Sequence, residues 1–303
     1  MDRVWGGRRL ESVYSRALPE PETPFGESWE IVDRAGEQSI VRDGPHAGLS
    51  LHDLWSKHRE EIFGPGLPAG ERFPLLIKIL DARDDLSIQV HPPAAVAPEL
   101  DGEPKTEMWF IAAAEPGAKL YVGLRDGVSR EDFERAITDG TVADCVHAIE
   151  PRAGESIFIP SGRLHAIGGG LLIFEIQQNS DTTYRVFDWN RVGLDGNPRQ
   201  LHVGESLASI DFDDFEPGMD QPQGNTIATC EHFQVERLAV AAGETAGNPR
   251  DDRFSILSVV EGRLEDAEGK SHGPGEFLLL PAGAAALKAA ENTIVLRTTI
   301  PPA

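Results

Sequence analysis

Gly154-ESIFIPSGRL-His165 is one of two copies of a single pattern, and the second copy is Gly275-EFLLLPAGAA-Ala286. In each copy five residues separate a glycine from a proline, and another glycine follows two positions after that proline. The spacing predicts a strand that begins at a glycine turn and ends at a Pro-x-Gly bend, and its repetition predicts two copies of one β unit. The bend directs the next side chains into the mouth of the unit, where the first copy has His165 and the second has Ala286.

The repeat extends upstream and sets the expected domain boundaries. Glu107-MWFIAAAEP-Gly117 parallels Asp252-RFSILSVVE-Gly262 more weakly, and the first copy is longer between its two segments. Between the copies, residues 211–225 are acidic and rich in turn formers, which is typical of a linker. We therefore expect an N-terminal domain over 1–211, with helical insertions, and a C-terminal domain over 226–303.

The composition fits a folded, mainly β protein. Of the 303 residues 40% are apolar, and short apolar runs lie between 31 glycines and 22 prolines. Capping boxes at Ser50 and Ser129 begin the few helical segments. We therefore predict a mainly β fold with a few helical insertions, whose strands include residues 73–80, 86–90, 108–113, 156–159 and 171–176.

Charge and apolar patterning argue against several classes of partner. The formal net charge of −22 opposes association with nucleic acid and with anionic lipid surfaces. No apolar run is long enough to span a bilayer, and no signal-peptide pattern follows Met1. Cys145 and Cys230 form no Cys-x-x-Cys pair, so neither a disulfide framework nor a thiolate zinc site is expected. We expect a cytoplasmic protein without nucleic-acid or membrane partners, and the sequence leaves its oligomeric state open.

One set of side chains in the first copy suits a divalent metal ion. Gln89 and His91 lie two residues apart in an extended segment, so their side chains point the same way. Glu107 at the start of the next predicted strand and His165 after the bend complete a set of two imidazoles, one carboxylate and one amide. Zn²⁺ or another divalent first-row ion accepts such donors and leaves room for water or substrate. Either histidine alone would be an ordinary hydrogen-bonded residue, so the combination carries the prediction.

Longer motifs carry a resemblance to a known family. The bend pattern resembles the second motif of the cupin superfamily, small jelly-roll barrels that hold a metal, which implies a bicupin whose C-terminal barrel has lost its ligand. The chain is also similar, more closely, to the type I mannose-6-phosphate isomerase family in its short bacterial form. This resemblance rests on five segments: Phe73-PLLIKI-Leu80, Leu86-SIQVH-Pro92, Pro104-KTEM-Trp109, Ile159-PSGRLHA-Ile167 and Ser180-DTTYRVF-Asp188.

The resemblance implies a zinc-dependent isomerase that interconverts mannose 6-phosphate and fructose 6-phosphate. It makes Arg185 the catalytic arginine and places Lys105 beside the sugar phosphate. Residues 93–95 depart from the family pattern, which usually has acidic residues there, and the C-terminal barrel agrees only in its overall pattern. The four residues that the resemblance implies as ligands of one zinc ion per chain are Gln89, His91, Glu107 and His165.

The reaction implied is an aldose–ketose isomerisation, in which a proton moves between C2 and C1 through a cis-enediolate. Zinc and the forked guanidinium of Arg185 suit the charge that develops on O1 and O2. Lys105, a zinc-bound water and Glu175 are all open as the general base. A phosphate substrate needs a local positive patch, for which Lys78, Lys105, Arg185 and Arg191 are candidates.

Two other functions fit the same residues. One is a metal-dependent cupin isomerase or epimerase that acts on a different phosphosugar by the same enediolate chemistry. The other is a non-catalytic sugar-binding or regulatory bicupin in which the metal is structural. A regulator would need a nucleic-acid or partner module, and the sequence shows no basic helix-turn-helix region.

Overall fold

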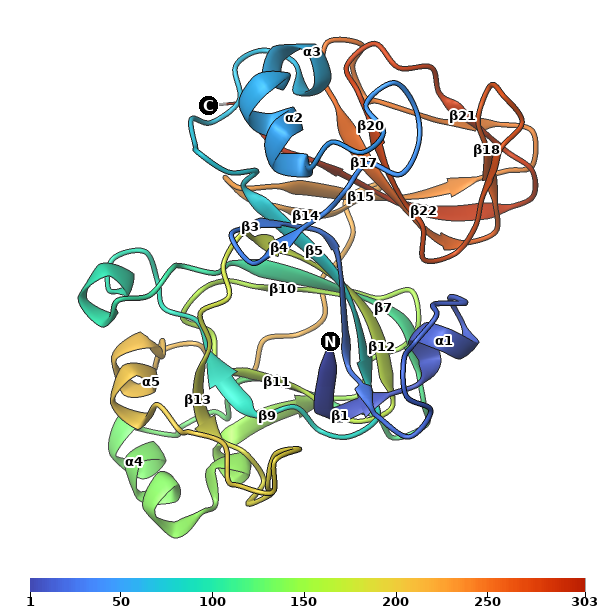
Figure 1. Cartoon of the computed structure of the whole chain (residues 1–303). Coiled ribbons are helices and arrows are strands. Elements are labelled where there is room, and N and C mark those ends of the chain that lie inside the picture. Colours follow the sequence, from blue (N-terminus) through green and yellow to red (C-terminus); the bar gives the residue numbers. More distant parts are fainter. Residues whose placement is uncertain (303) are drawn as a thin grey trace. The chain divides into compact units, whose positions relative to one another are not determined.

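The computed structural model describes residues 1–302, and most of its regular structure is β-sheet (Figure 1). Its contacts divide the chain into two compact units. Unit 1 comprises Met1–Ser28 and Lys78–Asp220, and unit 2 comprises Trp29–Ile77 and the chain from Gln221 onward. Each unit contains two antiparallel sheets, which confirms the prediction of a mainly β fold with two related halves.

Unit 1 contains the larger pair of sheets. One sheet has the strand order β1-β5-β12-β7-β10, with β2 also paired to β5, and the other has the order β13-β6-β11-β8-β9. The strands are β1 (Asp2–Gly7), β2 (Glu27–Ile31), β5 (Leu75–Ala82), β6 (Ile88–Val90), β7 (Glu107–Ala114), β8 (Leu120–Leu124), β9 (Val146–Ile149), β10 (Ser156–Ile159), β11 (His165–Ile167), β12 (Leu171–Gln178) and β13 (Tyr184–Phe187). The first residues of β5 and the last residues of β2 belong to unit 2.

Alternation along the strands builds the core of unit 1. Trp109 and Ile111 of β7 pack with Leu120 and Val122 of β8 in one buried cluster, so the apolar interior lies between the two sheets. Helices occupy the connections, and α4 begins at the capping box that the sequence predicts at Ser129. The helices of unit 1 are α1 (Arg9–Ser12), α4 (Arg130–Asp139), α5 (Val203–Ser209) and the 3₁₀ turns η1 (Ala97–Leu100) and η2 (Val142–Cys145).

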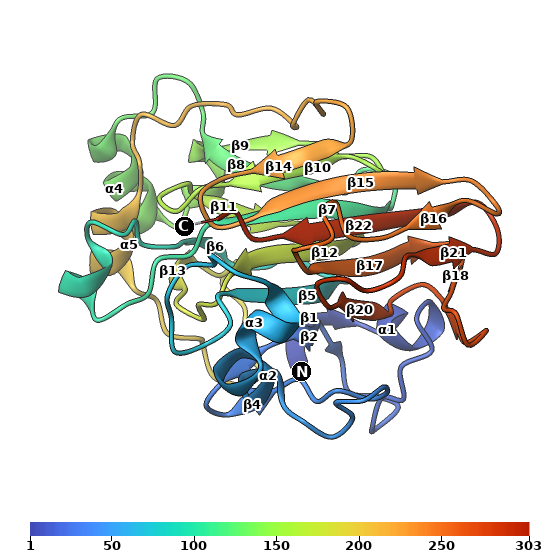
Figure 2. The ribbon, with the colours of Figure 1, turned by 90° about the horizontal axis from the view of Figure 1, so that it is seen from above.

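Unit 2 repeats this arrangement with shorter strands. Its sheets have the orders β14-β15-β22-β17-β20 and β16-β21-β18-β19, and Figure 2 shows β15, β22 and β17 side by side. A small β3-β4 hairpin and two helices complete it, and the capping box at Ser50 begins α2 as predicted. The elements are β3 (Asp33–Arg34), β4 (Glu37–Gln38), α2 (Leu51–Lys57), α3 (Arg59–Phe63), β14 (Thr226–Thr229), β15 (Gln234–Val240), β16 (Thr245–Ala246), β17 (Ser255–Glu261), β18 (Leu264–Glu265), β19 (Ser271–His272), β20 (Phe277–Leu280), β21 (Leu287–Ala289) and β22 (Thr293–Thr299).

The two strand orders confirm the internal repeat. In unit 1, β7 lies between β12 and β10, and in unit 2 the corresponding strand β17 lies between β22 and β20. Ile159 of β10 pairs with Glu107, and Leu280 of β20 pairs with Ser255. Ser255 is therefore the structural counterpart of Glu107.

This register corrects the weaker half of the sequence alignment. Matching Gly117 to Gly262 had placed Asp252 opposite Glu107, which is wrong by three residues. Five residues separate β7 from β8, whereas only two separate β17 from β18. Because the turn of the second copy is shorter, an alignment on the turn glycines shifts the strand that precedes them.

The contacts also group one segment differently from the expected domains. The sequence placed residues 29–77 in the N-terminal domain, but these residues pack with the C-terminal strands of unit 2. Phe63 and Phe73 show why, because both rings contact Phe254, at centroid separations of 5.0 and 6.0 Å. The division between the units at residues 220 and 221 falls inside the expected linker, and the boundaries 1–211 and 226–303 otherwise stay a prediction. None of the helices within residues 1–302 has the length and apolar character that a membrane span requires.

Candidate metal centre and adjoining cavity

The four predicted ligand residues come from three strand regions of unit 1. Gln89 lies in β6 and His91 follows the end of that strand, Glu107 begins β7, and His165 begins β11. The Pro-x-Gly bend at Pro160 takes the chain from β10 in one sheet to β11 in the other. This crossing places His165 directly opposite Gln89 in the β6–β11 ladder.

The donor atoms of these residues face a common centre. His91 Nε2 lies 3.6 Å from Glu107 Oε2, and His165 Nε2 lies 3.7 Å from Glu107 Oε1. Ligand atoms of the three residues all lie within 4.8 Å of one another, and all three side chains are buried. The Gln89 amide reaches the same place, with its Nε2 3.3 Å from His165 Nε2, and an amide flip would turn Oε1 there instead.

Backbone carbonyls fix both imidazoles in the form that binds a metal. His91 Nδ1 donates to the carbonyl of Thr182 at 2.8 Å, and His165 Nδ1 donates to the carbonyl of Arg163 at 2.9 Å. Because a carbonyl can only accept, Nδ1 carries the proton and Nε2 presents its lone pair to the centre. Burial lowers the pKa of both rings, and that of His91 falls to about 4. Both histidines are therefore neutral at pH 7, as metal ligation requires.

The Glu107 carboxylate lies among these residues without a hydrogen-bond donor. Both of its oxygens are buried and neither accepts a hydrogen bond from residues 1–302. Lys105 Nζ lies 2.8 Å from Oε2 and pairs with it by charge, although the two are not aligned as a hydrogen bond. Burial raises the pKa of this carboxyl, but the Lys105 ammonium outweighs that effect and holds the pKa well below its usual range. An ionised carboxylate beside two imidazole lone pairs fits a divalent metal ion.

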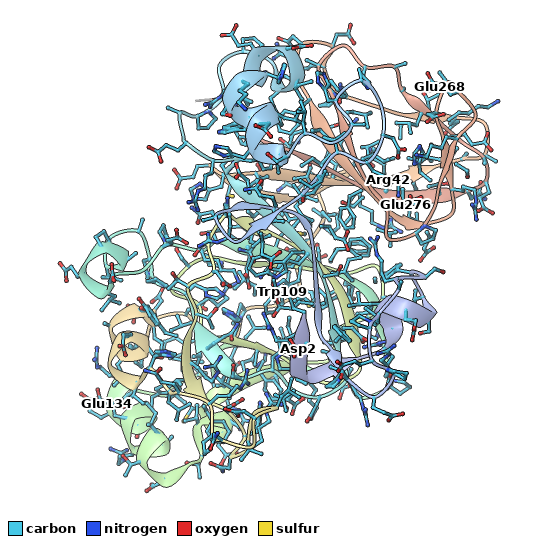
Figure 3. All side chains as sticks on the ribbon, in the orientation of Figure 1. Asp2, Arg42, Trp109, Glu134, Glu268 and Glu276 are labelled. Atoms are coloured by element: carbon cyan, nitrogen blue, oxygen red, sulfur yellow. The ribbon has the colours of Figure 1, made fainter. Side chains whose placement is uncertain are left out.

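A cavity of about 610 Å³ adjoins this centre, and its lining residues all belong to unit 1. Gln89 and His165 reach it from the metal side, and Asp2 and Trp109, both labelled in Figure 3, also line it. The volume lies in the range of small-molecule sites. The cavity therefore offers a ligand direct access to the centre.

A row of buried charges crosses the cavity wall. Lys78 is only 5% exposed and pairs with Glu175 at 3.2 Å, so this lysine faces inward, which the strand alternation alone left open. Glu175 Oε2 accepts from Trp109 Nε1 at 3.1 Å, and its Oε1 lies 3.8 Å from Lys105 Nζ. Burial lowers the pKa of Lys105, but Glu107 and Glu175 outweigh it and raise the pKa, so Lys105 is a charged ammonium at pH 7.

Arg185 is the cation of the cavity that has no carboxylate partner. It pairs with Gln89 in the β6–β13 ladder, and its Nε donates to Ser87 Oγ at 3.2 Å. Its remaining bond goes to the carbonyl of Gln200 at 2.9 Å, and no carboxylate of residues 1–302 lies within ion-pair distance. The structure thus excludes a simple surface ion pair and leaves the guanidinium available to an anion.

The structure adds cavity residues that sequence reasoning missed. Arg3 lines the cavity and pairs with Glu27 at 2.8 Å, and Arg199 lines it from the loop after β13. Arg191, a predicted phosphate contact, is absent from the lining and pairs with Asp188 at 3.0 Å. No sequence signal marked either residue, because Arg3 comes from the first strand of the chain and Arg199 follows Arg185 in a loop without a recognisable pattern.

Comparison with known proteins identifies the family. A model of the catalytic domain of type I phosphomannose isomerase matches residues 1–105. The mannose-6-phosphate isomerase ManA of Bacillus subtilis is 33% identical over 294 residues, which cover 93% of this chain and 90% of the relative. This chain belongs to the type I phosphomannose isomerase family. A mannose-6-phosphate isomerase of Streptococcus mutans is 41% identical over 206 residues, 68% of this chain and 63% of that protein.

Solved structures of isomerases share the fold over the whole chain. The mannose 6-phosphate isomerase of Bacillus subtilis covers 99% of this chain and 97% of its own, with a TM-score of 0.87 and 31% identity. A mannose 6-phosphate isomerase bound with zinc and yttrium has a TM-score of 0.75 at 17% identity, covering 99% of this chain and 97% of its own. The second comparison, at this low identity, shows a shared fold alone.

In unit 2, other residues stand at every position that the register identifies as a counterpart of the metal centre. Ala286 stands in place of His165, and Ser255 in place of Glu107. Gly247 faces Ala286 as Gln89 faces His165, and a Cβ added to Gly247 would lie 2.8 Å from that of Ala286. These side chains offer neither an imidazole nor a carboxylate, so this place in unit 2 lacks the metal-binding groups that unit 1 has.

A charge-reversed ion pair fills the corresponding place in unit 2. Arg297 lies opposite Leu257 on the neighbouring strand, as Glu175 lies opposite Trp109 in unit 1. Its guanidinium forms an ion pair with Glu236 at 2.7 Å. Arg297 Nη1 also donates to the carbonyl of Gly247 at 2.9 Å. In unit 2 a guanidinium thus stands at the ladder position that Glu175 holds in unit 1, and we expect its role to be structural.

Arg297→Met is expected to lower the free energy of unfolding by about 1–3 kcal/mol, because it leaves a largely buried Glu236 and a carbonyl without their donor. Denaturant unfolding measures this change, and zinc content and turnover should stay normal. The double variant Glu236→Leu/Arg297→Met should recover most of the loss, since both charges are then gone. A loss of metal with normal stability would contradict a purely structural role.

Proposed function

We propose that this chain interconverts mannose 6-phosphate and fructose 6-phosphate with one zinc ion held by Gln89, His91, Glu107 and His165. The observation that carries the proposal is the open Glu107 carboxylate facing two imidazole lone pairs, at the edge of a cavity that contains an unpaired guanidinium. The relatives named above support the substrate, and the donor set supports zinc. A sugar phosphate is an intracellular metabolite, so the proposal includes a cytoplasmic location.

A divalent ion held by these four residues would supply Lewis-acid stabilisation to the oxyanion charge that develops on the substrate. The residues of the chain then carry the proton transfer, in which the C2 proton of the aldose leaves and a proton is returned to C1. The intermediate between them is a cis-enediolate. Arg185 can donate two hydrogen bonds from its forked guanidinium to a developing oxyanion. It has no ion pair with a carboxylate of residues 1–302 that would have to break first.

The charges of the cavity wall favour one assignment of the base. Lys105 is an ammonium whose pKa the carboxylates raise, so it can hold a proton beside a substrate oxygen but is a poor acceptor. Glu175 lines the cavity, and its Oε1 accepts no hydrogen bond within residues 1–302. We therefore assign Glu175 as the base that moves the proton between C2 and C1, and Lys105 as the donor to the adjoining oxygen.

The decisive experiment is a coupled assay of fructose 6-phosphate formation from mannose 6-phosphate, run on the purified protein, the chelated protein and the chelated protein with zinc restored. Turnover that chelation abolishes and zinc restores is expected. Metal analysis of the untreated protein should find one divalent ion per chain. Free mannose serves as the control substrate, and we expect its turnover to be lower by at least tenfold.

Two results would point to the other functions. Turnover of a different phosphosugar in place of mannose 6-phosphate would show an isomerase or epimerase of another substrate, with the same metal chemistry. Bound metal without turnover of any phosphosugar would leave a sugar-binding bicupin. Protein purified without any divalent ion would contradict both enzyme assignments.

A further inference from the structure

The first part of the expected linker is a packed element of unit 1. Residues 211–220 exchange two backbone hydrogen bonds with Leu124 of β8, both of 2.9 Å. They also donate to the carbonyl of Gly162 at 2.8 Å and to that of Ser156 in β10 at 3.0 Å. This segment, the strap, therefore bonds to both sheets of unit 1 and to the Pro-x-Gly bend before His165.

The bend, residues 160–163, bonds in turn to three of the ligand-bearing segments. Its peptide N–H groups donate to the carbonyl of His91 at 2.8 Å and to the hydroxyl of Thr106, the residue before Glu107, at 3.3 Å. Its last carbonyl accepts from His165 Nδ1 at 2.9 Å, the hydrogen bond that directs Nε2 of this ring to the metal centre. A displacement of the bend would therefore disturb several ligands at once.

One ion pair between the strap and the bend holds the residue that supplies this carbonyl. Arg163 Nε and Nη2 donate to the two carboxylate oxygens of Asp214 at 2.8 and 2.9 Å, and Arg163 Nη1 donates to the carbonyl of Phe158 at 2.8 Å. The two side chains are only 17% and 16% exposed. A two-bonded arginine–carboxylate pair with little exposure is among the stronger polar contacts in proteins, so Asp214 fixes Arg163 at both ends of its fork.

The bend of unit 2 forms without such an ion pair. Ala284 stands where unit 1 has Arg163. Its N–H donates to the carbonyl of Pro281 at 3.0 Å, and the same hydrogen bond closes the bend of unit 1 at 3.1 Å. The turn itself therefore does not require the arginine. The copy that lacks the metal-binding groups also lacks the ion pair, which associates the pair with the metal centre and not with the formation of the bend.

We propose that Asp214 is a positioning residue of the metal centre, which it serves by holding Arg163 and, through it, the carbonyl that orients His165. This inference rests on the ligand set of the proposed function. Outer partners that fix the tautomer and the direction of a ligating imidazole raise the affinity of a site for its metal. The strap thereby contributes to zinc binding, although none of its residues is a predicted ligand.

Asp214→Asn tests the proposal, because it removes the charge and keeps the size of the side chain. The affinity of the chelated protein for zinc, measured by competition with a chromophoric chelator, is expected to fall tenfold to a hundredfold, the usual effect of losing an outer partner. Arg163→Met should lose as much. The double variant should lose no more than the larger single loss, because both residues act through one ion pair.

Turnover separates positioning from catalysis. Asp214 lies outside the cavity lining, so it touches no substrate. In saturating zinc, kcat of Asp214→Asn for mannose 6-phosphate should therefore return to within about threefold of the wild type. A kcat that stays low at full zinc occupancy would overturn the proposal, because the effect would then lie in the reaction and not in metal binding.

Asp213→Asn is the matched control. It makes the same change of charge one residue away, on an exposed side chain that forms no hydrogen bond or ion pair within residues 1–302. Its zinc affinity should stay within about twofold of the wild type, as for an ordinary surface substitution. An equal loss of affinity in Asp213→Asn would show that the overall charge of the strap is responsible, and it would overturn the role of Asp214.

Nuclear magnetic resonance of the ring nitrogens supplies a readout that a merely structural role would not move. In the zinc-free protein at pH 8, the ¹⁵N shifts of His165 should change in Asp214→Asn. Those of His91 should not, because its Nδ1 donates to the carbonyl of Thr182, outside the bend. Equal changes at both rings, together with a lower free energy of unfolding, would show a general loosening of unit 1 and would overturn the proposal.

The zinc titrations also distinguish this inference from the proposed function. Unchanged zinc affinity in both Asp214→Asn and Arg163→Met would overturn the inference and leave the isomerase assignment intact. If the wild type binds zinc but does not turn over mannose 6-phosphate, the proposed function fails alone, and the affinities of the variants still decide the role of Asp214. A wild type that binds no divalent ion would overturn the ligand set and this inference together.

Discussion

Glu107→Ala is expected to remove the bound zinc and to lower kcat/KM for mannose 6-phosphate by at least about a thousandfold. The carboxylate is the only anionic member of the ligand set, and its two oxygens face both imidazoles. Loss of the Lewis acid removes several kcal/mol of transition-state stabilisation, which corresponds to that factor. Metal analysis and the coupled assay measure the two effects together, and His165→Ala and His91→Ala should behave in the same way.

The second unit offers the matched control for this prediction. Ser255 occupies the register position of Glu107, so Ser255→Ala makes the corresponding truncation where no metal is expected. Zinc content and turnover should be those of the wild type. Glu107→Gln separates charge from shape, and we expect it to lose zinc while it keeps the side-chain volume. Full zinc occupancy with normal turnover in Glu107→Ala would show that the ligand assignment is wrong.

Arg185→Lys is expected to reduce kcat and kcat/KM by similar factors, on the order of tenfold to a thousandfold, by analogy with the loss of one oxyanion donor. The substitution keeps the positive charge but loses the fork that lets one residue hold Ser87 and still donate to the substrate. Steady-state kinetics separate the two constants, and zinc content should remain normal because Arg185 is not a predicted ligand.

The alternative role of Arg185 has a different signature. If KM rises in Arg185→Lys while kcat holds, Arg185 binds the phosphate of the sugar, and discrimination between phosphorylated and free mannose should weaken. If both constants stay within about twofold, a change under roughly half a kcal/mol, the guanidinium makes no functional contact. Arg191 could not take over that role, because it lies outside the cavity lining and pairs with Asp188 and Asp84.

Local patterns in the sequence were sufficient for the strands, the repeat and the family. The predicted strand 156–159 has the bounds of β10, and both capping boxes begin helices, because glycine turns, proline bends and cap side chains act over a few residues. The sequence also grouped the residues of the metal centre, because i and i+2 positions of a strand share a face and the repeat identified the bend before His165. Their roles as zinc ligands stay predictions.

Contacts between residues far apart in the sequence determined the features that local patterns did not predict. Residues 29–77 joined unit 2 because Phe63 and Phe73 pack on Phe254, a contact that no local pattern encodes. Arg199 lines the cavity and Arg191 does not, although both pair with Asp188. The sequence by itself determined which chemical groups the chain carries and which strands present them. Only the tertiary structure decided which charges meet, since pairing between distant residues depends on how the sheets stack and not on spacing along the chain.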